Sequence, residues 1–235
     1  MAVIITRERI WATEFRRVAS LALSDFHRIE LERILQHKLL TPLFQPLVSL
    51  ADGSVLGYEA LIRGPSDSAL HSPISLFKTA QSFHLLEPLE LLCRQMSIQA
   101  FAQANTPGLL FLNVNPLLLL TSDHPSGLTK RYIQQAGLAP ERIVIELSEQ
   151  FQVEDTELFV NAVKHYREFG FQIAIDDLGS GFSGLKLWSE LQPDIVKIDR
   201  YFIDQLHSDP IKKAFVRNII ELAKNTGSLI VAEGI

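Results

Sequence analysis

Residues 173–185 read IAIDDLGSGFSGL and carry the clearest pattern in the chain. An apolar run reaches two adjacent carboxylates, Asp176 and Asp177, and is followed by a loop with three glycines and then by a helical pattern. The pattern predicts a strand that ends in acid. Neighbouring like charges repel and apolar surroundings raise the cost of ionising both, so such a pair usually has a cation beside it. The stretch therefore predicts a metal site.

Short apolar runs and helical patterns alternate along the chain from residue 43 onwards. Seven runs predict strands: 44–50, 55–63, 109–114, 142–147, 171–176, 194–199 and 228–233. Helical patterns lie near 75–104, 127–136, 155–168, 184–190 and 209–225. Asp52 and Gly53 between the first two runs are a hairpin signal, so the first pair is predicted to be antiparallel. The later alternation requires a parallel sheet, and both an open doubly wound sheet and a closed barrel satisfy it.

The first 40 residues have a different pattern. Apolar residues recur at helical spacing over 8–40, between arginines, histidines and acids, which predicts an amphipathic helical leader over 1–40 and one domain over 41–235. A helix that packs on the domain, or joins it to a preceding segment, is favoured over a membrane-surface helix. The reason is that Glu14, Asp25, Glu30 and Glu32 offset the basic residues.

Composition excludes several classes of function. A net charge of −5 argues against binding of a nucleic acid polymer. Cys93 is the single cysteine, so an internal disulfide and a cysteine-based zinc site are excluded. No apolar run approaches the roughly 20 residues that span a bilayer. We therefore expect a cytoplasmic protein without a membrane span.

Polar residues stand at the ends of six successive predicted strands. They are Glu59, Asn113, Glu146, Asp176 with Asp177, Lys197 and Glu233. A single such residue would be a solvated strand end, whereas six in succession favour a site, because strand ends converge on one mouth of a barrel. The two-residue period of a strand places Ala174 and Asp176 on one face. The pattern predicts an inward-facing ring of acids.

This ligand set favours Mg²⁺ or Mn²⁺, because it offers oxygen atoms and no Cys or His. Two such ions about 3.5–4 Å apart could hold a phosphodiester and activate water. Lys197 could neutralise developing charge, or could simply form a salt bridge to the acids, and Glu233 could accept the proton of the water. Arg63 lies on the same strand face as Glu59 and is suited either to bind phosphate or to remain exposed.

A dinucleotide-binding fingerprint is also present, because Gly179, Gly181 and Gly184 spell G-x-G-x-x-G after a strand, with Asp199 near the position of a ribose-binding acid. Two carboxylates directly before the first glycine would repel a pyrophosphate. The fingerprint normally follows the first strand of a fold, and here it follows the fifth. Both observations disfavour this interpretation.

The motifs together resemble the EAL-domain phosphodiesterases, which hydrolyse the bacterial second messenger cyclic di-GMP to linear pGpG. The triplet that names the family is Glu59, Ala60 and Leu61, and the blocks FQPLVSL, LNVNP, IELSE, IDDLGSGFSGL, DIVKIDRYFI and VAEGI follow the family order. The resemblance implies a TIM-like (β/α)8 barrel with an antiparallel first strand. Leu178 stands where the family usually has an aromatic residue.

The resemblance also assigns roles to residues. The implied metal ligands are Glu59, Asn113, Glu146, Asp176 and Asp177. The implied catalytic residues are Glu59, Lys197 and Glu233, and the implied substrate contacts are Gln45 and Arg63. Glu149 would support a loop that contains Gly179, Ser180 and Gly181. Mg²⁺ or Mn²⁺ would be the cofactor, Ca²⁺ would inhibit, and the protein would act as a homodimer.

The resemblance raises two further expectations. Only seven strands are predicted before Ile235, so the barrel is expected to lack its eighth strand in this chain, and sensory or signalling domains could lie beyond the chain ends. The alternative to an enzyme is a receptor that binds cyclic di-GMP without hydrolysing it.

Overall fold

The computed structural model describes residues 25–116, 127–149, 156–181 and 184–235. The chain divides into two compact units, Met1–Pro42 with Ile62–Cys93, and Leu43–Leu61 with Arg94–Ile235. The first unit contains a helix over 25–37 and helix α2 (Pro73–Ser82). The predicted leader helix is therefore present from residue 25, its earlier part lies outside the described residues, and its separation from the domain at residue 40 stays a prediction.

The described strands form one seven-stranded sheet in the order of the chain. They are β1 (Thr41–Val48), β2 (Val55–Arg63), β3 (Leu109–Asn113), β4 (Ile143–Ser148), β5 (Gln172–Leu178), β6 (Ile195–Ile198) and β7 (Leu229–Ala232). Neighbours from β2 to β7 pair in parallel. The β1–β2 turn is closed by Ser49 N–H, which donates to Ser54 O at 2.8 Å. This confirms the TIM-like α/β fold with an antiparallel first strand, and no eighth strand lies within the described residues.

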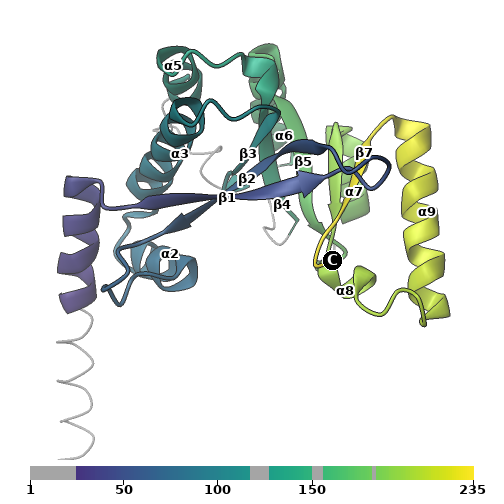
Figure 1. Ribbon diagram of the computed structural model, residues 1–235, viewed down its shortest axis with the longest axis horizontal. Coiled ribbons are helices and arrows are strands. Elements are labelled where there is room, and N and C mark those ends of the chain that lie inside the picture. Colours follow the sequence, from purple (N-terminus) through teal and green to yellow (C-terminus); the bar gives the residue numbers. More distant parts are fainter. Residues whose placement is uncertain (1–24, 117–126, 150–155, 182–183) are drawn as a thin grey trace, which may run out of the picture. The chain divides into compact units, whose positions relative to one another are not determined.

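Helices connect the parallel strands. They are α3 (Leu86–Gln103), α5 (Leu128–Gln135), α6 (Thr156–Glu168), α7 (Gly184–Leu191), α8 (Arg200–Ile203) and α9 (Pro210–Thr226), with a 3-10 turn at Pro140–Arg142. Figure 1 shows α9 beside β7 at the yellow end of the chain. Local sequence sets the bounds of α9, because the Asp209 side chain accepts from two backbone N–H groups at its start and Gly227, with φ +78°, ends it. Within the described residues, no helix has the length and apolarity to cross a membrane.

Two apolar layers flank the parallel strands. Outward-facing side chains of β3, β4 and β5 pack on α3, α5 and α6, and the buried members include Phe101, Ile145 and Phe159. The other face carries a smaller buried cluster of Phe111, Val144, Ala174 and Ile195. Each residue of this inner cluster is followed two positions later by Asn113, Glu146, Asp176 or Lys197. Because side chains alternate along a strand, the apolar floor and the polar residues share one face.

The strand bounds lie within three residues of the predicted runs, and the structure adds two features that the sequence pattern did not specify. The helical region near 75–104 is two helices, because the chain turns at His84, which has φ +56°, between α2 and α3. Strand β5 continues past Asp176 to Leu178, and its pairing with β6 shifts register between Ile175 and Leu178. This irregularity changes the direction of the second aspartate.

Candidate functional site

The candidate site is a group of acids around one buried lysine, and all of it belongs to the second unit. Lys197 Nζ lies 2.9 Å from one carboxylate oxygen of each of Glu59, Glu146, Asp176 and Glu233. The lysine side chain is only 2% exposed. These contacts join β2, β4, β5, β6 and the residue that follows β7, so five segments meet at one ammonium group.

An ammonium group carries three hydrogens, so it cannot donate to four carboxylates at once. Of the four contacts, the one with Glu59 has hydrogen-bond geometry. Glu146 contacts Nζ through Oε1 as an ion pair, and both of its carboxylate oxygens are buried without a hydrogen-bond partner. A buried carboxylate in this state is costly. Such a deficit of positive charge around a buried carboxylate is typical of a site that binds a cation.

Burial and mutual repulsion perturb the protonation of the group. Burial alone would lower the pKa of Lys197, but the charges of its four partners outweigh burial and hold that pKa well above its usual value. Burial raises the pKa of Glu146 well above the ordinary range, against the pull of Lys197. Burial likewise raises the pKa of Glu233. Lys197 is therefore protonated, and its single positive charge does not balance the negative charges of the surrounding carboxylates.

Asp177 joins this group because of its backbone conformation. Adjacent residues of a regular strand point to opposite faces, and a bulge can re-aim one of them. Asp177 has φ +56° and lies within the register shift of β5. Ligand oxygens of Asp176, Asp177 and Glu233 lie within 4.8 Å of one another, the one such cluster found in the described part of the chain. Burial, followed by the charge of Asp176, raises the pKa of Asp177 to about 6.

Asn113 supplies the neutral member of the set. Its Nδ2 donates to Glu59 Oε1 at 3.0 Å, so the two side chains predicted as ligands from β3 and β2 are in direct contact. Counting Glu59, Glu146, Asp176, Asp177 and Glu233 as ionised, five carboxylates face one ammonium, a net charge of −4. Oxygen donors in this number fit hard divalent cations such as Mg²⁺, Mn²⁺ or Ca²⁺.

The glycine-rich loop is organised around Glu149, which is 3% exposed. Glu149 Oε1 accepts from Gly179 N–H at 2.9 Å and also from Gly181 N–H. A Cβ on Gly184 would overlap Glu149 Oε2, so only glycine fits there. The backbone N–H groups that a dinucleotide cradle would need are therefore used by a carboxylate, which agrees with the rejection of that interpretation.

The positions of the remaining predicted residues give less information about their roles. Ser180 N–H donates to Asp177 O at 3.0 Å, within the supported loop. Gln45 is exposed on β1. Arg63 is the last residue of β2 and belongs to the first unit, and its Nη1 donates to the carbonyl of Ile62 at 2.8 Å. The substrate roles of Gln45 and Arg63 stay predictions.

Two nearby residues had no site role in the sequence analysis. Asp199 is not a ribose ligand: its Oδ1 accepts from Tyr201 N–H at 2.7 Å and caps α8, and its charge contributes to the raised pKa of Asp177. The ring of Phe202 lies against Gly179. An Asp directly before a helical turn is a recognisable cap, but no local pattern shows that Phe202 contacts a glycine 23 positions earlier.

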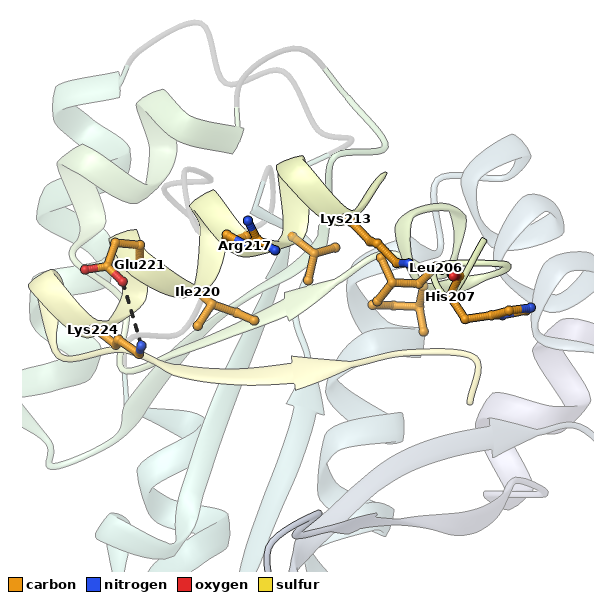
Figure 2. A pocket seen from close by; sticks show the side chains of 9 residues that line it. Leu206, His207, Lys213, Arg217, Ile220, Glu221 and Lys224 are labelled. Carbon is orange, nitrogen blue, oxygen red and sulfur yellow. Dashed lines mark hydrogen bonds and ion pairs between the residues drawn. The ribbon is translucent and has the colours of Figure 1, made fainter. Parts of the chain in front are cut away.

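A separate groove of about 630 Å³ runs along α9 (Figure 2). Its lining residues are Ile203, Leu206, His207, Lys213, Val216, Arg217, Ile220, Glu221 and Lys224. Glu221 is the one carboxylate among them, and its Oε2 lies 3.7 Å from Lys224 Nζ. The groove therefore lacks the cluster of carboxylates that surrounds Lys197.

Comparison with known proteins identifies relatives of the chain. The chain is 35% identical over 196 residues to the probable cyclic di-GMP phosphodiesterase PdeB of Escherichia coli, an alignment that covers 82% of this chain and 37% of PdeB. Among solved structures, the calcium/cy-diGMP complex of Klebsiella pneumoniae BlrP1 matches with a TM-score of 0.76 and 29% identity, over 84% of this chain and 49% of BlrP1.

The manganese/cy-diGMP complex of the same Klebsiella protein matches with a TM-score of 0.77 and 28% identity, over 84% of this chain and 50% of that chain. The chain thus spans about a third to a half of the length of these relatives. The EAL domain pattern itself matches residues 28–235, which include every acid that contacts Lys197. By this match and by its fold, the chain belongs to the EAL domain family.

Proposed function

We propose that the chain is a metal-dependent phosphodiesterase that hydrolyses cyclic di-GMP to linear pGpG in bacterial second-messenger signalling. The observation that supports this most is the ring of buried and partly buried carboxylates around Lys197, in a chain of the EAL domain family. The names of PdeB and of the BlrP1 complexes supply the substrate class.

The charge balance of the ring favours two divalent cations. Its net charge of −4, with all acids ionised, is matched by two ions of charge +2. The residues that would hold them are Glu59, Asn113, Glu146, Asp176 and Asp177. When bound, Mg²⁺ or Mn²⁺ would polarise the phosphoryl oxygens and lower the pKa of a bound water. Ca²⁺ accepts more ligands in a looser geometry, so we expect it to support binding but to inhibit turnover.

Lys197 and Glu233 would act on the reacting groups. The ammonium of Lys197 is permanently charged and held among acids, so it can stabilise negative charge that develops on the phosphate. Burial raises the pKa of Glu233 toward neutral pH. A general base is most effective when its pKa lies near the working pH. Gln45 and Arg63 would contact the substrate, and Glu149 would hold the loop that follows Asp177.

Two parts of the proposal, homodimerisation and additional sensory or signalling domains beyond the chain ends, rest on the family resemblance. A cytoplasmic location is proposed from the apolar pattern of the sequence. Because the chain spans 37% of the length of PdeB, the activity of the whole protein is also part of the proposal.

The test is turnover of cyclic di-GMP by the chain in Mn²⁺, followed by chromatography for pGpG. Glu146→Gln removes one buried ring charge without changing side-chain size, and we expect it to abolish turnover. Glu141→Gln makes the same chemical change at an exposed position five residues earlier, and it should retain turnover. Absence of pGpG in both Mn²⁺ and Mg²⁺ would refute the proposal. Tight binding of cyclic di-GMP without formation of pGpG would favour the receptor alternative.

A further inference from the structure

Asp177 is held in place by an unusual stretch of backbone. Its φ is +56°, and that of Gly179 is +102°. Positive φ costs an L-amino acid about 1–2 kcal/mol, and Asp adopts it more often than most residues but still as a minority conformation, so surrounding contacts are needed to hold Asp177 there. The direction of its carboxylate therefore depends on the contacts that hold the residues after it.

Two side chains hold Gly179. Glu149 Oε1 accepts its N–H at 2.9 Å. The ring of Phe202 occupies the space where a side chain would stand, since a Cβ on Gly179 would overlap Cε2 and lie 2.8 Å from Cδ2 and 3.1 Å from Cζ of that ring. Gly179 is thus fixed by a hydrogen bond to one side chain and by direct packing against another.

Phe202 is itself firmly placed. Its N–H donates to Asp199 O at 3.0 Å, and Asp199 N–H donates to Leu178 O at 3.2 Å, which joins the start of α8 to the end of β5. Its ring contacts those of Tyr201 and Phe215, with centroid separations of 5.2 and 5.7 Å. The ring is therefore a fixed surface against which the loop after Asp177 packs.

We infer that Phe202 is a positioning residue for the metal site: its ring, packed on Gly179, holds Asp177 in the left-handed conformation that brings its carboxylate to Asp176 and Glu233. The inference rests on the proposed metal-dependent function. Partners that orient metal ligands typically change metal affinity by about 10–100-fold when they are removed. Phe202 would do so through backbone packing, whereas Glu149 would do so through hydrogen bonds.

The experiment is calorimetric titration of the 235-residue chain with MnCl2 in the absence of substrate, at a temperature below the unfolding midpoint of every variant. Phe202→Ala should raise the Mn²⁺ dissociation constant by about 10-fold. Phe202→Leu keeps part of the packing and should give a smaller increase. Phe26→Ala makes the same chemical change at an exposed position of the first unit, and should change the constant by less than about twofold.

The outcomes separate this inference from the proposed function. An unchanged dissociation constant in Phe202→Ala, or an equal increase in Phe26→Ala, would overturn the positioning role alone. If Phe202→Ala does not fold, Phe202→Leu decides by the same comparison. A failure of the unchanged chain to bind Mn²⁺ would overturn the proposed function and the positioning role together.

Discussion

Asp177→Asn is expected to stabilise the metal-free protein while it removes a metal ligand. The fold raises the pKa of Asp177 from 3.8 to about 6. A difference of about two pKa units corresponds to about 3 kcal/mol between the two protonation states. Because the side chain is partly exposed, solvent screening reduces the cost of its charge to about 1.5 kcal/mol. Asparagine carries no charge and avoids this cost.

The pH dependence follows from the raised pKa. Between about pH 4 and pH 6 the folded chain binds a proton at Asp177 that the unfolded chain has lost, so the stability of the metal-free protein falls as the pH rises through this window. Asp177→Asn should therefore raise the melting temperature by about 3–6 °C at pH 7.5 in EDTA. The gain should shrink to about half at pH 5 and become small at pH 4.

The assay is thermal unfolding followed by circular dichroism, in EDTA and then in Mn²⁺. The unchanged chain should gain stability from Mn²⁺, and Asp177→Asn should gain much less, because ligand binding stabilises in proportion to affinity. Asp204→Asn is the matched control at an exposed carboxylate outside the acid cluster, and it should change neither value. A melting temperature of Asp177→Asn at or below that of the unchanged chain, at pH 7.5 in EDTA, would refute the reasoning.

Three further changes test the packing and charge of the site and its scaffold. Lys197→Met leaves four carboxylates, two buried and two partly buried, without their counter-charge. Urea denaturation in EDTA at pH 7.5 should show a loss of about 3–5 kcal/mol, and equal or greater stability would contradict the role of the lysine. Gly57→Ala places a Cβ 2.5 Å from Leu109 O, so urea denaturation should show a free energy of unfolding that is about 1–3 kcal/mol lower. An unchanged denaturation midpoint would count against this close approach of β2 and β3. Arg142→Ala removes two hydrogen bonds to backbone carbonyls and should lower the free energy of unfolding by about 1–3 kcal/mol in the same assay. Its Mn²⁺ affinity should not change, and a change would show that the substitution also affects the site.

Much of the fold was predictable because it depends on local periodicity. The alternation of apolar runs and helical patterns gave the strand order, and Asp52 with Gly53 gave the antiparallel first pair. Glu146 and Asp176 were also visible in the sequence, since each stands two positions after a buried apolar residue of the inner face. Burial of that face requires a period of two, and the same period carries the polar residues to the mouth of the sheet.

The sequence by itself thus determined which residues are strand-end acids, on which strands they lie and what kind of cation they suit. The tertiary structure decided which of them meet. The bulge in β5 turns Asp177 to the side of Asp176, against the alternation of a regular strand. Lys197 reaches four carboxylates, and Phe202 packs on Gly179, only because chain segments distant in sequence converge. Such contacts depend on register, backbone conformation and packing, none of which a local pattern encodes.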